Sequence, residues 1–245
     1  MAPEANEGDG DHVPSRWPEH RIGVPINAMH WRNLTFLHWP VEPARIEPML
    51  SPGVRVDTFD GAAWVGITPF RMSYLGTPAP RVPLVPGFTE INVRTYVRGR
   101  DGDDGVWFFS LECSRLPVTA LLRLLGLPYQ QSTTDQRRRG TELQYTSKRR
   151  SGQGWFGARV RVGSRIEVPT EFEDFLTGRW NAYSRAWGQL WRTPIEHEPW
   201  PLHRATAHCS PADLLAVNGL PSPAGEPITH FSPLVHVRVG PPRPV

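Results

Sequence analysis

The run Phe88-Thr-Glu-Ile-Asn-Val-Arg-Thr-Tyr-Val97 alternates polar and apolar side chains along its whole length. Because the side chains of a β-strand point alternately to its two faces, the run predicts a strand with two different faces. One face carries β-branched residues at alternate positions from 89 to 97 and must meet a core. The other face carries only polar side chains, at Glu90, Asn92, Arg94 and Tyr96.

This polar face either meets water or lines an enclosed cavity. An outer face in water is the ordinary origin of such alternation in a half-buried strand. In a cavity, however, an acid, an amide, a guanidinium and a phenol spaced about 7 Å apart can orient a small anion or a polar ketone. Burial would also require the charges to be neutralised, so there we expect Glu90 and Arg94 to compensate each other.

Strand patterns continue on both sides of this run, and helical patterns are few. We expect further strands within residues 33–39, 54–59, 63–72, 105–113, 141–150, 155–162, 181–187, 190–195, 203–208 and 234–239. We expect helices within residues 42–50, 115–125, 170–176 and 211–217, the third opening with a capping box of Thr170 and Glu173. These patterns predict a mainly β (α+β) fold, an antiparallel barrel with a few peripheral helices.

Length and composition are those of one domain. The chain has 245 residues, of which 39% are hydrophobic, and we expect a single domain over residues 21–240. Residues 1–20 and 241–245 have the polar or Pro-rich composition of tails. An apolar run long enough to span a membrane and a signal-peptide core are both missing, and the two cysteines form no disulfide framework. These features predict a cytoplasmic protein without a membrane partner.

Several short motifs carry a family resemblance. Phe88-Thr-Glu90 opens a strand and Leu-Pro-Tyr129 follows a helix, an arrangement that resembles the acetoacetate decarboxylase-like superfamily. Four further motifs resemble the YqjF-like group of uncharacterised bacterial proteins within it, from about His30 to Arg243: His30-Trp-Arg32, Asp57-Thr-Phe-Asp-Gly61, Asn92-Val-Arg-Thr-Tyr96 and His197-Glu-Pro-Trp200. The resemblance implies an acetoacetate decarboxylase-like antiparallel β-barrel or cone, a homo-oligomer, and an active-site position for Glu90.

The sequence departs from the decarboxylases at the residues that do their chemistry. Where those enzymes have a pair of lysines, this chain has Tyr129-Gln130. A Schiff base requires a primary amine that is free near neutral pH, and neither side chain has one. The only lysine, Lys148, lies beside Arg149 and Arg150 on a predicted exposed hairpin. The sequence therefore argues against a Schiff-base decarboxylase.

These observations predict an internal polar pocket for a small organic acid or ketone. Glu90 is the candidate proton-transfer group, and an enzyme of this kind would be a lyase- or hydrolase-like acid–base catalyst without a Schiff-base lysine. The candidate binding residues lie on the same strand, after the helix, and at the end of an earlier strand: Asn92, Arg94, Tyr96, Tyr129, Gln130, His38 and Trp39. Since neither a phosphate-binding loop nor a metal-ligand spacing is found, we expect no cofactor and no metal. A non-catalytic ligand-binding protein remains an equal alternative.

A second alternative is based on the charged hairpin Arg137–Arg150. Arg137-Arg138-Arg139 and Lys148-Arg149-Arg150 flank a predicted turn at Gly140 and could bind nucleic acid or an acidic partner. The same residues also suit a solvated hairpin whose charges keep its edge soluble. We favour the solvated hairpin because no nucleic-acid recognition motif accompanies the charges and the net charge is only +3.

Overall fold

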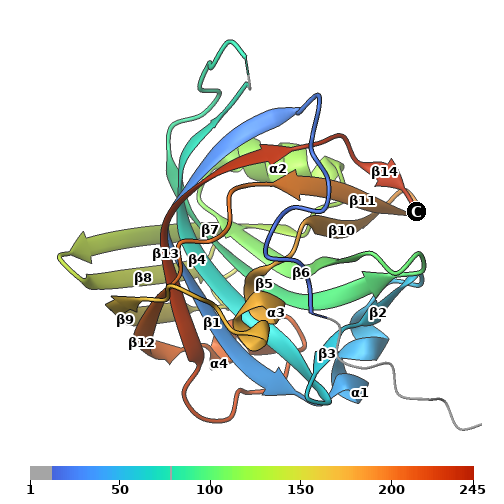
Figure 1. Cartoon of the computed structure of the whole chain (residues 1–245). Coiled ribbons are helices and arrows are strands. Elements are labelled where there is room, and N and C mark those ends of the chain that lie inside the picture. Colours follow the sequence, from blue (N-terminus) through green and yellow to red (C-terminus); the bar gives the residue numbers. More distant parts are fainter. Residues whose placement is uncertain (1–12, 78) are drawn as a thin grey trace, which may run out of the picture.

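Seven strands close into a ring in residues 13–77 and 79–245, the part of the chain that the computed structural model describes (Figure 1). Each strand pairs with the next, and the last pairs with the first. In order round the ring they are β13 (Ile228–Val239), β1 (Asn27–Val41), β4 (Ala62–Gly76), β5 (Phe88–Gly99), β6 (Asp104–Cys113), β10 (Asn181–Ala186) and β11 (Gln189–Glu196). The mainly β fold class is therefore confirmed.

A second row of strands runs outside this ring and joins β6 to β13. It consists of β7 (Tyr129–Arg139), β8 (Glu142–Arg149), β9 (Phe156–Arg165) and β12 (His203–Ser210). The pairs β6–β7 and β6–β10 are parallel, so the sheet is mixed rather than purely antiparallel as the sequence predicted. Three short strands complete the sheet: β2 (Val54–Val56), β3 (Thr58–Phe59) and β14 (Arg243–Pro244).

Strands β1, β4 and β5 are buried on both faces, because the ring and the outer row each enclose a core. Between the two layers, Leu37, Ile67 and Ile91 pack with Leu143 and Tyr145 of β8. The opposite faces of the same strands point into the ring. The polar face of β5 is thus turned inward and buried, which excludes the solvent-exposed alternative for that strand.

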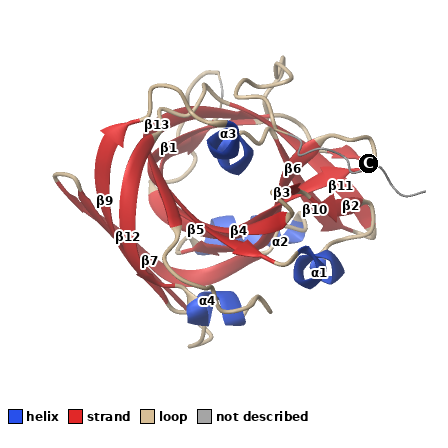
Figure 2. Cartoon of the chain, turned by 60° about the horizontal axis from the view of Figure 1, so that its bottom comes forward, coloured by secondary structure: helices blue, strands red, loops and turns tan. Residues whose placement is uncertain are grey.

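Four short helices lie around the sheet, and α3 lies within the outline of the ring in Figure 2. Phe175 and Leu176 of α3 (Glu171–Thr177) pack on Tyr96 and Trp64 of the ring. The predicted capping box of Thr170 and Glu173 is present. The other helices are α1 (Pro43–Ile46), which continues as the 3-10 helix η1 (Glu47–Met49), α2 (Leu116–Leu124) and α4 (Ala212–Ala216).

Both described ends of the chain contact the fold. Residues 1–12 of the predicted N-terminal tail lie outside the described residues. Within the remainder of that tail, Arg16 forms a 2.8 Å ion pair with Asp174 of α3. At the other end, Arg243 and Pro244 form β14 and pair with β11. Residues on both sides of the range 21–240 therefore contact the fold. Among the described residues, none of the helices has the length and apolarity that crossing a membrane requires.

Candidate functional site

Sheet register places polar side chains from neighbouring strands in rows on the inner face of the ring. His38 pairs across β1 and β4 with Gly66, which pairs in turn with Arg94 of β5. The next row pairs Thr68 with Asn92. Directly paired residues of antiparallel strands lie on the same face, so these side chains share one wall inside the ring. We call His38, Thr68, Asn92 and Arg94 the polar wall.

Glu90 lies at the end of this wall that is nearer to α2, and its carboxyl group is hydrogen-bonded to Tyr129. The Tyr129 hydroxyl donates a 2.9 Å hydrogen bond to Oε2 of Glu90, and both residues are buried. Burial raises the pKa of Glu90 to about 7, although the Tyr129 hydrogen bond opposes the shift. Burial and the Glu90 carboxyl raise the pKa of Tyr129 well above its usual value. The carboxyl group therefore exchanges a proton near neutral pH while the phenol stays protonated.

The expected compensation between Glu90 and Arg94 is not found among the described residues. Four residues of strand separate the two Cα atoms by roughly 13 Å, and the Glu90 carboxyl accepts its hydrogen bond from Tyr129 instead. Arg94 is 8% exposed, and no hydrogen bond or ion pair joins its guanidinium to another described residue. It lies instead over the rings of Phe36 and Tyr96, at 5.3 Å and 5.7 Å from their centroids.

Other buried or largely buried arginines of the described chain differ from Arg94 in this respect. Arg149 forms a 2.7 Å ion pair with Glu112, and Arg98 and Arg179 lie 3.2 Å and 2.7 Å from Asp57. A buried charge without a counter-charge is costly, so such groups are normally paired. The polar wall thus holds a cation whose counter-ion is not supplied by the described residues.

His38 joins the polar wall as a neutral imidazole. Its Nε2 lies 2.6 Å from the Tyr96 hydroxyl, which in turn donates a 2.5 Å bond to the Leu176 carbonyl. Because the single phenolic proton goes to Leu176, Nε2 of His38 must carry a hydrogen and donate it to Tyr96. Burial, assisted by the charge of Arg94, lowers the pKa of His38 well below its usual value. Nδ1 is therefore left as a bare acceptor.

Several buried polar atoms of this wall have no hydrogen-bond partner in the described chain. They are Nδ1 of His38, Oγ1 of Thr68, Oδ1 of Asn92 and Nε of Arg94. Buried polar atoms in folded proteins nearly always have a partner, either protein, water or ligand. These atoms are concentrated in two neighbouring rows of the polar wall, where they leave unused hydrogen-bonding capacity.

Aromatic rings lie beside this wall in the interior of the ring. Trp200 stacks on Trp31 at 6.1 Å and meets Phe36 edge-on at 5.1 Å. Trp31 and Leu34 can both enter this interior because Asn33 has a left-handed backbone (φ 49°) at a register shift of β1. The interior next to the polar wall is therefore partly filled by aromatic rings.

Two predicted site residues do not join this wall. Trp39 follows His38 directly, so it points to the opposite face, where it packs in the core beneath the outer row and donates to the Gly225 carbonyl at 3.2 Å. Gln130 follows Tyr129 in the same way, and its Oε1 accepts a 3.0 Å bond from Arg123 at an exposed position. The alternation of side chains along a strand could by itself have shown that Trp39 and Gln130 point away from the face of His38 and Tyr129.

One residue of the wall was missed from the sequence. Thr68 lies within a predicted strand, two positions after Gly66, in a run that is otherwise apolar. Gly66 and Thr68, a small and a polar residue at alternate positions of an apolar strand, could have indicated a polar face. Without the sheet register, however, the sequence could not show that they lie opposite Arg94 and Asn92.

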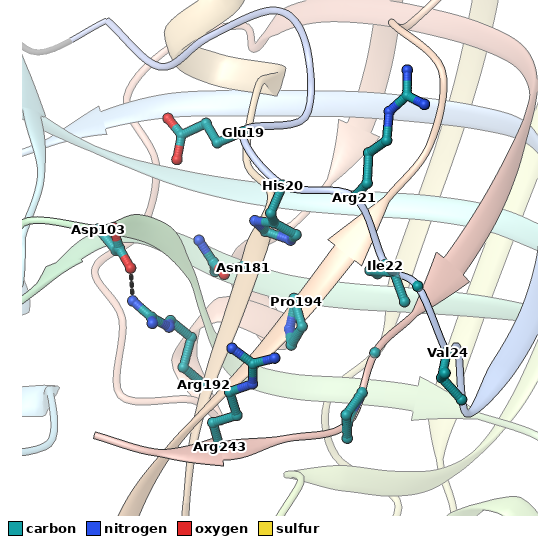
Figure 3. A pocket seen from close by; sticks show the side chains of 13 residues that line it. Glu19, His20, Arg21, Ile22, Val24, Asp103, Asn181, Arg192, Pro194 and Arg243 are labelled. Atoms are coloured by element: carbon teal, nitrogen blue, oxygen red, sulfur yellow. Dashed lines mark ion pairs between the residues drawn. The ribbon is translucent and has the colours of Figure 1, made fainter.

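A separate groove lies at the rim, between residues 19–24 and the C-terminal strands (Figure 3). Its volume is about 520 Å³, and Arg192, Arg243 and His20 lie along it. Arg192 already forms ion pairs with Asp101, at 2.9 Å, and with Asp103. Since carboxylates of the chain compensate this arginine, the groove gives weaker evidence for an anion site than the polar wall does.

Comparisons with known sequences identify relatives along most of the chain. The model of the DUF2071 family, described as "Uncharacterized conserved protein (COG2071)", matches residues 28–236. The chain is 30% identical over 231 residues to "Uncharacterized protein YqjF" of Bacillus subtilis, covering 90% of this chain and 94% of that protein.

Solved structures with little sequence identity share the architecture. The enduracididine biosynthesis enzyme MppR complexed with pyruvate is 14% identical, with a TM-score of 0.67 over 92% of this chain and 93% of that one. Acetoacetate decarboxylase from Legionella pneumophila is 15% identical, with a TM-score of 0.63 over 99% and 98%. At these identities the likeness concerns the fold alone, and it confirms the acetoacetate decarboxylase-like architecture.

Proposed function

The chain belongs to the DUF2071 family, and we propose that this member binds a small organic acid inside its ring of strands, with the acid's carboxylate on Arg94. The observation that carries the proposal is the buried guanidinium of Arg94, which lacks a counter-charge among the described residues. A carboxylate would complete a charge-assisted pair there and offset the cost of burying the cation. The neighbour of the same fold that was solved with pyruvate supports an acid of this size.

The polar wall supplies the remaining contacts for such a ligand. Oδ1 of Asn92 and Nδ1 of His38 are acceptors without a partner among the residues that the structure describes, and the Thr68 hydroxyl can donate or accept. A short oxo acid presents a carboxylate and a carbonyl, and its hydrated or enol form adds a hydroxyl donor. We therefore assign the ligand to the 2-oxo or 3-oxo acids, with aromatic rings excluding water around it.

Glu90 is the proposed proton-transfer group. With a pKa of about 7, its carboxylate and carboxylic acid forms are both populated at neutral pH. In the carboxylate form it would accept a proton from the carbon beside the ligand's ketone, forming the O–H bond as the C–H bond breaks. The same proton, or one exchanged with solvent, then returns to carbon. Tyr129 would orient the carboxyl group through its hydrogen bond.

Schiff-base chemistry has no support inside the ring. Lys148, the one lysine of the chain, is exposed on β8 in the outer row. The proposed chemistry therefore uses oxygen and imidazole groups rather than an amine.

Titration of pyruvate and acetoacetate by calorimetry tests the binding proposal. We expect the wild-type protein to bind at least one of them, and Arg94→Met to bind it at least about tenfold more weakly. Arg150→Met, a matched change at an exposed arginine of the hairpin, should leave the affinity unchanged. Equal affinities of the wild type and Arg94→Met would exclude the proposed carboxylate site.

Hydrogen exchange of the ligand tests the role of Glu90. Pyruvate incubated with the protein in heavy water should lose its methyl proton signal faster than pyruvate alone. Glu90→Gln should bind pyruvate but return the exchange rate to that of the protein-free sample. Exchange by Glu90→Gln at the wild-type rate would remove Glu90 as the base, and absence of exchange in the wild type would reduce the function to binding.

The charged hairpin gives less support to a second function. Arg138 donates a 2.6 Å bond to Oδ1 of Asn33 and lies 5.5 Å from the Phe231 ring, Arg137 pairs with Asp135, and Arg149 pairs with Glu112. Three of the six cationic side chains of the hairpin therefore already interact with other residues of the chain. We therefore propose no nucleic-acid function for this hairpin.

A further inference from the structure

An apolar pocket of about 460 Å³ lies between α2 and the adjacent end of the ring. None of the described residues that line it is charged. The lining comes from α2, from the ends of β1, β4, β5, β7 and β13, from the loop before β5, and from β10, β11 and the turn between them. It includes Met72, Leu84, Phe88, Leu121, Tyr129 and Trp187. A volume of this size suits a small molecule.

This pocket lies next to the candidate site along β5. Phe88 lies two residues before Glu90 on the same face of β5, and it pairs with Met72, which also lines the pocket. Tyr129 belongs to both regions, because its ring lines the pocket while its hydroxyl binds Glu90. The interior thus passes from apolar to polar along β5, beginning at Phe88 and ending at Tyr96.

The rim of the pocket exposes large apolar side chains. Leu121 is 59% exposed, Leu84 62% and Trp187 75%. Contiguous exposed apolar surface of this kind marks a binding surface in soluble proteins. Since the pocket has no charged group to hold a carboxylate, only the apolar part of a ligand would gain from occupying it.

We infer that the ligand of this protein is an oxo acid with an apolar tail, whose head group contacts the polar wall and whose tail fills the pocket beside α2. The inference rests on the proposed function and specifies its ligand class. A tail in this pocket would pass Tyr129 and Glu90, so the reactive carbon would lie between the tail and the carboxylate.

The test compares straight-chain 2-oxo acids of increasing length, from pyruvate to 2-oxooctanoate, by calorimetry. Each methylene that enters the pocket should increase the affinity by up to about fourfold. Leu121→Asp, in the pocket wall, should abolish this dependence on length and leave the affinity for pyruvate unchanged. Leu124→Asp is the matched control, since Leu124 is an exposed leucine of the same helix that does not line the pocket.

The outcomes separate this inference from the proposed function. Equal affinity for all chain lengths, with Arg94→Met still weakening pyruvate binding, would overturn the apolar tail and leave the carboxylate site intact. Arg94→Met without effect on any acid would overturn the proposed function. A dimer that Leu121→Asp converts to a monomer in sedimentation, without any dependence on chain length, would assign the apolar rim to self-association and also overturn the inference.

Discussion

Gly66 lies between His38 and Arg94 on the polar wall, and because it has no side chain the His38 ring can lie close to β4. A Cβ atom at this position would lie 3.0 Å from Cδ2 and 3.1 Å from Nε2 of His38. The ring would have to move, and its 2.6 Å bond to Tyr96 would be lost or weakened. We expect Gly66→Ala to lower the free energy of unfolding by about 1–3 kcal/mol, measured with urea, and to weaken pyruvate binding.

Gly23→Ala is the control for this substitution. Its added Cβ would meet nothing within 4 Å, so both stability and binding should remain at the wild-type level. If Gly66→Ala behaved like Gly23→Ala, the close packing of His38 against β4 would not matter to the site.

The ionisation of Glu90 makes a prediction about pH. Burial raises its pKa from 4.5 to about 7, so the folded state binds this proton more tightly than the unfolded state. The free energy of unfolding therefore falls as pH rises from about 4.5 to 7, and the loss is complete above pH 7. Glu90→Gln cannot ionise, so its stability relative to the wild type should increase over this range by about 3 kcal/mol.

Urea unfolding of both proteins at pH 5 and pH 8 measures this difference. The exposed Glu142→Gln should show no comparable change with pH. A difference between wild type and Glu90→Gln that stays constant with pH would show that Glu90 titrates normally.

At the scale of elements, strand β5 was predictable but its surroundings were not. Alternation located the strand and its polar face, because side-chain direction follows from the backbone alone. Whether that face met water depended on β10, β11 and β13, which close the ring around it and come from distant parts of the chain. No local pattern in residues 88–97 could report these distant strands.

Strand β7 escaped prediction for a related reason. Residues 129–139 are mostly polar or charged, and only Tyr129 and Ser132 are buried. A strand at the surface of an outer row has little apolar periodicity to detect. The first half of β13 was also missed, since His230, Ser232 and Pro233 interrupt an apolar pattern, although the first two are buried in the fold.

Helix α3 carries a capping box that was recognisable from four residues. The Thr170 hydroxyl accepts a hydrogen bond from the Glu173 backbone, and the Glu173 carboxylate accepts from the Thr170 backbone at 2.7 Å. We expect Thr170→Ala to lower the free energy of unfolding by about 1 kcal/mol, whereas Thr170→Ser, which keeps the hydroxyl, should be near neutral. Equal stability of the two variants in urea unfolding would show that the cap contributes nothing.

At the scale of the whole molecule, one ion pair ties the outer row of strands to the ring. Arg149 of β8 binds Glu112 of β6 through two nitrogens, and Glu112 also accepts bonds from Ser110 and Ser132. In the sequence, Arg149 looked like its neighbours in a charged hairpin. Its burial became visible only when the tertiary structure placed Glu112 beside it.

Replacing Arg149 should therefore affect the entire fold. Arg149→Met leaves the fully buried Glu112 without its counter-charge and should lower the free energy of unfolding by about 3–5 kcal/mol. Arg150→Met, at the exposed neighbouring position, should change it by less than about 0.5 kcal/mol. Chemical denaturation of the three proteins measures both values, and similar losses for the two variants would contradict the assignment of Glu112 and Arg149 as a buried pair.

The double burial of β1, β4 and β5 also constrains how this chain can change in length during evolution. A one-residue insertion within β5 would exchange its faces, turning Ile91 and Val93 into the ring and Arg94 into the apolar core beneath the outer row. A two-residue insertion would keep each side chain on its face of the strand, but it would shift the sheet register that aligns His38, Gly66 and Arg94. Gaps in future alignments of this lineage should thus fall in connections such as residues 79–87 and 218–227, while these three strands keep a constant length.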